Sequence, residues 1–308
     1  MSFKFENSGI AASVFLALYV VYTALTIKIV HNEGWNTIYT SLLIHGVFRV
    51  GGQLCGVAFA AIGWDQFGWL IGYLVLSAEG YFVLILTAYH LIAKAQYQVV
   101  GYSWIRPNQA DIKAKVAAAT TARGRFCARV TPARVFHAVL IPANAYIISG
   151  GSMLAGLSAD ELNNGSSKVS TSRGLRTAGQ AVFLAQTIVA VAFAIKCYFN
   201  EKVKHYNIIA VFIAAPFLLV RGIFGILSIF VDKMDYYLIT NYTANGLSPS
   251  FVAFEYCLGT SMEFITASVF VLTYYIERRQ LRRKDLEDIN SDVAKLIKIE
   301  DKDKDDSE

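Results

Sequence analysis

Seven long apolar stretches are the feature that most restricts what this chain can fold into. They cover residues 9–30, 37–62, 67–92, 135–157, 175–199, 206–231 and 251–276. Each approaches or exceeds the roughly 20 residues that an α-helix needs to cross the hydrocarbon core of a bilayer. Because 55% of the chain is hydrophobic and its mean hydropathy is positive, we predict an all-α, polytopic membrane protein, a bundle of seven transmembrane helices.

The first apolar stretch is predicted to remain as the first span. It is longer than the apolar core of a signal peptide and lacks a basic segment before it. We therefore assign residues 1–276 to the membrane domain and residues 277–308 to a tail. The tail begins basic and ends acidic, which predicts a short amphipathic helix followed by a partly disordered end.

The distribution of Lys and Arg predicts the orientation of the bundle, because basic loops stay on the cytoplasmic side. The loop 94–134 contains eight basic residues and one acidic residue, Asp111. Lys202, Lys204 and the basic cluster after residue 277 fall on the same side by parity. The N-terminus is then outside and the C-terminus inside. The second half of loop 94–134 reads either as an interfacial helix or as a solvated basic loop.

Two glycosylation acceptor sequences agree with this orientation. Asn164 is followed by Gly-Ser and Asn241 by Tyr-Thr, and both lie in loops predicted to be outside. A glycoprotein is therefore expected.

Four ionisable residues lie near the middle of predicted spans, where a charge costs about 3 kcal/mol on insertion scales. They are Arg49, Glu79, Arg221 and Glu263. We predict two buried pairs, Arg49 with Glu79 and Arg221 with Glu263, and crossed pairing is also open. The pairs could fix helix register or form a substrate or proton site. The same order of Arg and Glu in both halves is compatible with a parallel repeat or with coincidence.

Further polar residues inside the spans are predicted to share one central polar cavity with these charges. His45 lies one turn from Arg49, and it could relay protons or simply bond a backbone carbonyl. The others are Glu255, Asn144 and Gln186.

Several activities are not indicated by the sequence. The spans contain no His, Cys or Asp spacing typical of a metal site, and no Gly-rich loop followed by Lys is present. No Lys occurs in residues 251–276 that could bind retinal. We expect no cofactor, no metal, no nucleic-acid partner and no enzymatic activity.

The stretch Pro216-Phe-Leu-Leu-Val-Arg-Gly-Ile-Phe224, followed by a mid-span Glu in the next helix, resembles a family of fungal seven-helix integral membrane proteins of unknown function. That resemblance implies a membrane location and supplies no activity. The chain is more distantly similar to fungal lipid-translocating exporters of the aminocholesterol-resistance type, whose signature is R-x-x-[YF]-R-x-x-E. Arg221 and Phe224 match it, whereas Gly225 and Ser228 replace the second Arg and the Glu. Helix count alone also resembles fungal seven-helix receptors.

Two functions follow as expectations. The first is a transporter or lipid-handling protein with a central cavity lined by the Arg and Glu residues, whose ligand is a small molecule or a lipid. The second is a ligand-sensing receptor, in which loop 94–134 or the tail binds a cytoplasmic partner.

Overall fold

The computed structural model describes residues 3–66, 68–154, 167–236, 238–243 and 246–305, and within them the fold is a helical bundle. Seven helices are long and apolar enough to cross a membrane, which confirms the all-α prediction. These are α1 (Glu6–Glu33), α2 (Ile38–Ile62), α3 (Gly68–Val100), α6 (Pro132–Ser152), α8 (Ser167–Ile195), α9 (Tyr206–Phe230) and α11 (Ser261–Asp305).

Short elements connect or extend the seven long helices. They are the 3₁₀ turns Gly63–Gln66, Asp232–Met234 and Ile239–Asn241, the helices α4 (Gln109–Ala118), α5 (Ala122–Arg129) and α10 (Pro249–Phe254), the π-helical segments η2 (Lys196–Asn200) and η5 (Glu255–Thr260), and the strands β1 (Tyr242–Thr243) and β2 (Gly246–Leu247). The two strands pair antiparallel, with Tyr242 opposite Leu247. Because η5 joins α10 to α11 without a break, the three elements form one continuous span.

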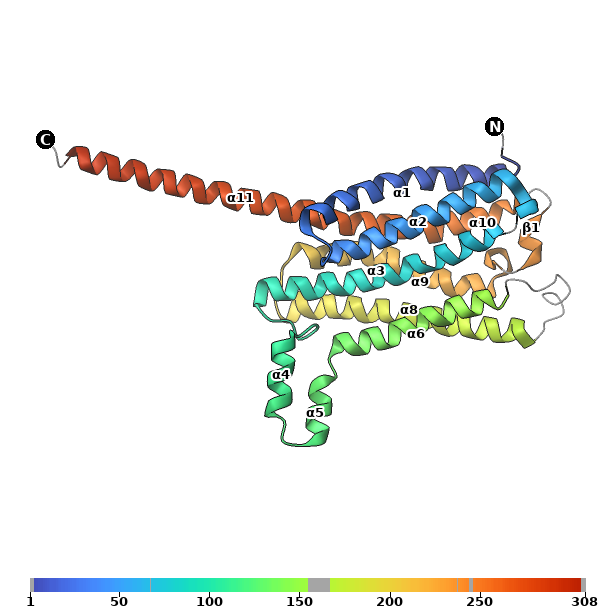
Figure 1. The fold of residues 1–308 in the computed structure, drawn as a ribbon, viewed down its shortest axis with the longest axis horizontal. Coiled ribbons are helices and arrows are strands. Elements are labelled where there is room, and N and C mark those ends of the chain that lie inside the picture. The colour runs from blue at the N-terminus through green and yellow to red at the C-terminus, as the bar shows by residue number, and fades with distance from the viewer. Residues whose placement is uncertain (1–2, 67, 155–166, 237, 244–245, 306–308) are drawn as a thin grey trace.

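Helix α3 is the central span of the bundle. It packs against α2, α6, α8, α9 and α11, while α1 packs against α2 and α11 at the periphery. The spans alternate in direction, so the N-terminus and the C-terminus lie at opposite ends of the bundle (Figure 1). Large apolar side chains on the outer faces remain exposed, as expected of surfaces that contact lipid.

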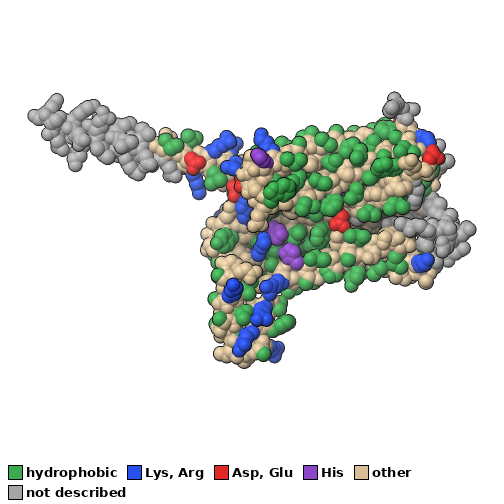
Figure 2. Space-filling view, in the orientation of Figure 1, with side chains coloured by type: hydrophobic (Ala, Val, Ile, Leu, Met, Phe, Trp, Pro, Cys, Tyr) green, Lys and Arg blue, Asp and Glu red, His purple; other side chains and the backbone are tan. Residues whose placement is uncertain are grey.

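One end of the bundle gathers most of the basic side chains, and we call it the basic end. It contains the connections 34–37, 101–131 and 201–205 and the part of α11 after residue 277. Lys and Arg side chains cover α4 and α5 and the start of the α11 extension, whereas hydrophobic side chains cover the spans (Figure 2). All loops whose charge predicted the cytoplasmic side therefore share one end.

The basic loop 94–134 contains two helices, α4 and α5, which form what we call the basic hairpin. Asn108 caps α4 by accepting a hydrogen bond from the Asp111 amide, and Thr121 caps α5 in the same way from Gly124. The hairpin projects sideways from the basic end, away from the bundle of spans (Figure 1).

Helix α11 continues beyond the last predicted span as one helix through Asp305 (Figure 1). No Gly or Pro occurs between Ser261 and Asp305 to end it. An Arg283–Glu287 pair four residues apart adds support on the exposed surface, with the two side chains 3.0 Å apart.

Of the two predicted glycosylation acceptors, Asn164 lies outside the described residues. Asn241 is buried, and its Nδ2 donates to the carbonyl oxygens of Asp232 at 2.5 Å and Asp235 at 2.9 Å. A glycan on Asn241 would therefore have to be added before this loop folds.

Candidate functional site

The middle of the bundle contains a buried ionic cluster in which one carboxylate serves two guanidinium groups. Glu263 on α11 accepts from Arg49 of α2 at Oε2 and from Arg221 Nε of α9 at Oε1, the latter at 2.6 Å. The exposed fractions are 2% for Arg49, 8% for Arg221 and 0% for Glu263. The Arg49–Glu263–Arg221 triad is therefore enclosed by protein and links three spans.

Helix α3 approaches the triad through a glycine. A Cβ atom at position 80 would lie 2.5 Å from Nε and Nη2 of Arg49, which is closer than side-chain carbons approach other atoms. Gly80 thus lets the α3 backbone lie directly against the charged groups. Any larger residue there would push α3 away or displace Arg49.

Aromatic rings cover the other side of Arg221. Its guanidinium carbon lies 5.3 Å from the centre of the Tyr81 ring and 5.8 Å from that of Phe224, within range of cation–π attraction. The Tyr81 hydroxyl shares a hydrogen bond of 2.7 Å with Thr187 Oγ1 and lies 3.1 Å from the Leu218 carbonyl oxygen. Tyr81 of α3 therefore ties α8 and α9 together beside the triad.

The predicted pair of Arg49 with Glu79 is wrong. Glu79 is only partly buried, and its two carboxylate oxygens accept from Asn144 Nδ2 of α6 at 3.1 and 2.9 Å. One residue along a helix turns the side chain by about 100°. Since Gly80 faces the triad, Glu79 points toward α6 instead, and Asn144 also lies outside the triad.

A second group of buried polar residues lies next to the triad, on and around η5. Tyr73 donates to Glu255 Oε1 at 3.3 Å, and Tyr256 donates to Gln53 Oε1 at 3.1 Å. Glu255 was predicted as part of the site, whereas Gln53 and Tyr73 were missed. The spacing of His45, Arg49 and Gln53, each four residues apart on α2, could have indicated Gln53, because such residues share one helix face.

The other predicted residues are buried but differ in their relation to the triad. The His45 ring lies against the Gly80 backbone and packs edge-on to Tyr19 and Tyr22, with centroids 5.9 and 6.0 Å away. Gln186 of α8 is buried, and no described contact joins it to the triad. Gln180, which sequence reasoning missed, flanks Gly225 together with Nη1 of Arg221.

Several polar atoms of this region have no hydrogen-bond partner among the described residues. They include His45 Nδ1 and Nε2, Arg49 Nε, Gln53 Nε2, Ser77 Oγ, Gln180 Oε1, Gln186 Oε1, Glu255 Oε2 and Thr260 Oγ1. An unmade hydrogen bond of a buried group costs about 1–3 kcal/mol, so such groups in a native protein usually bind water or a ligand.

The charges of the triad do not cancel. Arg stays protonated in proteins, so two guanidinium groups and one ionised carboxylate leave a net positive charge. Glu255 lies close enough to interact with both Arg residues. The site is therefore a buried, positively charged triad with a second carboxyl group beside it.

Within the described residues, no group of three or more His, Cys, Asp or Glu side chains is placed to hold a metal ion. Comparison of the chain with protein-family models, with curated proteins and with solved structures finds no match.

Proposed function

We propose that this multi-pass membrane protein is a transporter or lipid-handling protein, and that it binds an anionic group between Arg49 and Arg221. The observation that carries the proposal is that a single carboxylate, Glu263, bridges two buried guanidinium groups. Guanidinium groups bind carboxylates and phosphates through paired hydrogen bonds. An anionic substrate has the chemistry to take the place of Glu263.

In this proposal the described structure corresponds to a closed state. Glu263 occupies the anion position, and a substrate anion releases it when the bundle opens. Unpartnered polar atoms nearby, such as Gln53 Nε2 and Gln180 Oε1, supply further hydrogen bonds to a substrate. On the basis of the distant similarity to lipid-translocating exporters, we predict that the substrate is an anionic lipid rather than a soluble anion.

Reconstitution into liposomes tests the proposal. Vesicles carry a trace of fluorescently labelled phosphatidylserine or phosphatidylcholine, and a reductant added outside measures the rate at which labelled lipid reaches the outer leaflet. We expect the chain to accelerate exchange of phosphatidylserine. Arg221→Gln should slow it by about tenfold or more, the effect of losing a charged hydrogen bond worth roughly 1.5–3 kcal/mol.

Arg282→Gln is the matched control, because it removes one positive charge from an exposed position on α11, far from the triad. Arg221→Gln leaves Arg49 paired with Glu263, so the variant should still be monodisperse. Equal exchange rates for vesicles with and without the protein would reject lipid translocation. Equal exchange rates for Arg221→Gln and Arg282→Gln would remove Arg221 from the mechanism.

A receptor is the second candidate, and one observation favours it. The basic hairpin and the α11 extension emerge at the same end of the bundle, where a single partner could meet both (Figure 1). A receptor would leave lipid exchange unchanged in the same vesicles. It would instead retain a partner in crosslinking pull-downs only while the basic hairpin is present.

A further inference from the structure

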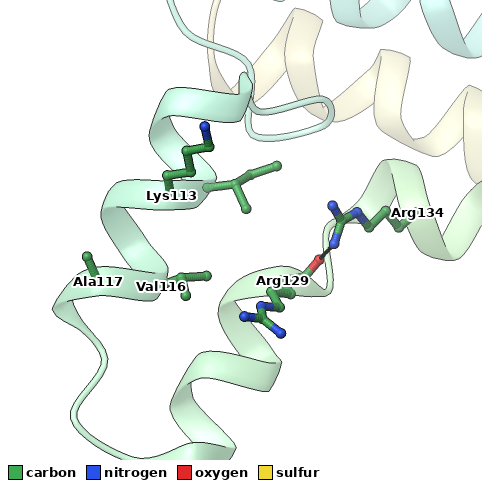
Figure 3. A pocket seen from close by; sticks show the side chains of 6 residues that line it. Lys113, Val116, Ala117, Arg129 and Arg134 are labelled. Carbon is green, nitrogen blue, oxygen red and sulfur yellow. Dashed lines mark hydrogen bonds between the residues drawn. The ribbon is translucent and has the colours of Figure 1, made fainter.

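A groove in the basic hairpin combines an apolar lining with three cationic side chains. It lies between α4, the last turn of α5 and the first turn of α6, and has a volume of about 300 Å³. Figure 3 labels residues that line it, with Lys113 on α4, Arg129 on α5 and Arg134 on α6. Its apolar lining consists of Ile112, Val116 and Ala117.

The cations of the groove are available to a ligand. Arg134 Nη1 donates to the Arg129 carbonyl oxygen at 2.8 Å, which fixes the last turn of α5 against α6. Across the described part of the chain, no carboxylate lies within ion-pair distance of Lys113, Arg129 or Arg134. Three cations that share an opening without a counterion attract an anion of more than one charge.

The position of the hairpin indicates that the anion belongs to a lipid. The hairpin extends sideways at the level where the spans end, with α5 on the side nearer the spans (Figure 1). Phe126 of α5 is 68% exposed and Val130 is 46% exposed, although both lie among arginines. Exposed apolar side chains on a basic helix that lies along the membrane plane are typical of interfacial helices.

We propose that this groove binds the phosphate headgroup of an anionic lipid in the leaflet that borders the basic end. Lys113, Arg129 and Arg134 contact the phosphate, and Ile112 and Val116 contact the glycerol and upper acyl region. Phe126 inserts beside the bound lipid. This site is separate from the triad and does not depend on transport.

Native mass spectrometry of the full-length chain in detergent tests the site. Dioleoyl phosphatidic acid and dioleoyl phosphatidylcholine are added at equal concentration, and the bound lipids are counted. The wild-type chain should bind phosphatidic acid more tightly than phosphatidylcholine. The triple variant Lys113→Gln/Arg129→Gln/Arg134→Gln should lose more than about tenfold of that preference, since each basic residue near an anionic lipid contributes about fivefold.

The matched control removes the same charge from the same end of the molecule but outside the groove, as Arg279→Gln/Arg282→Gln/Lys284→Gln. It should keep the preference for phosphatidic acid. An equal loss in both triple variants would mean diffuse attraction and overturn the site, as would no loss in either. Complete displacement of the lipid by inorganic phosphate would assign the groove to a free anion and also overturn the proposal.

A single substitution covers the case in which the triple variant does not fold. Lys113 is exposed on α4, so Lys113→Gln should be monodisperse and lose about fivefold in preference. Binding of a polyglutamate peptide in competition with phosphatidic acid would assign the groove to an acidic protein instead.

Discussion

Glu263 is the residue on which the charge balance of the bundle depends. It is fully buried and is the shared partner of Arg49 and Arg221. Removing one Arg leaves one neutral pair inside the protein. Removing the carboxylate leaves two guanidinium groups close together without the counterion that they share, and guanidinium groups cannot lose their protons to relieve the repulsion.

Substitution of the triad should therefore be asymmetric. Glu263→Gln should lower the free energy of unfolding by about 3–5 kcal/mol, the usual cost of leaving a buried charge uncompensated. Arg221→Gln should cost less than Glu263→Gln, because Arg49 still pairs with the carboxylate. The stability of both variants is measured by thermal unfolding in detergent, with the loss of monodisperse protein as the readout. A larger effect of Arg221→Gln would show that Glu263 is not the centre of charge compensation.

Sequence reasoning found the members of the triad and the pairing of Arg221 with Glu263, but not that Arg49 shares the same carboxylate. Arg49, Arg221 and Glu263 stand out because a charge is costly inside an apolar run. Their pairing depends on which face of α3 meets α2 and α11, and hydropathy gives depth but not rotation. Gly80 marks that face, yet a glycine in a membrane helix is too common for its role to be read without the structure.

At the level of single elements, the start of α9 depends on His205. Its Nδ1 accepts a hydrogen bond of 3.3 Å from the Asn207 amide, which caps the helix. Burial lowers the pKa of His205 and Lys94 adds to this, while Glu277 acts in the opposite direction. The fold thus favours the neutral ring, which alone can accept at Nδ1.

Acid should weaken this cap. Because the pKa of His205 is lower in the folded chain than in the unfolded one, its stabilisation is present above about pH 6.5, the ordinary value for His. The stabilisation is lost as the pH falls through the folded pKa. His205→Asn keeps an acceptor that does not titrate and should reduce the acid-induced drop in melting temperature.

His31→Asn is the matched control for this measurement. His31 is exposed on the last turn of α1, and its replacement should leave the pH dependence of the melting temperature unchanged. An unchanged pH profile for His205→Asn would mean that the cap does not contribute to acid sensitivity.

Elements were predicted well where composition alone decides them. All seven spans follow from their apolar length, and α11 extends beyond its prediction because nothing interrupts it. The π-helical turn η5 could not be predicted, since such turns arise where packing forces an extra residue into a helix. It places Glu255 beside Tyr73.

Across the whole molecule, the two ends of the bundle differ in charge. The spans alternate in direction, and the loops with most Lys and Arg meet at the basic end (Figure 2). Two further ion pairs connect helices at that end. Lys94 of α3 lies 2.6 Å from Glu277 of α11, and Arg278 of α11 lies 2.6 Å from Glu33 of α1. The fold therefore agrees with the charge pattern that predicts which end faces the cytoplasm.

We predict that the N-terminus is outside and the C-terminus inside, because basic loops are retained in the cytoplasm. In intact cells, an epitope tag before residue 1 should react with antibody, whereas a tag after residue 308 should react only after permeabilisation. The opposite result would place the basic hairpin outside and remove it from the anionic cytoplasmic leaflet.

The position of Glu263 in the last span has a consequence for biosynthesis. Arg49 and Arg221 belong to the second and sixth spans, whereas the carboxylate that pairs with both of them belongs to the seventh and enters the membrane last. A chain with six inserted spans thus carries two guanidinium groups without their native partner, at a cost of about 3 kcal/mol each. Entry of the seventh span relieves that cost and locks α2 to α9. A chain truncated before this span would retain the basic hairpin but present quality control with uncompensated charge in the bilayer.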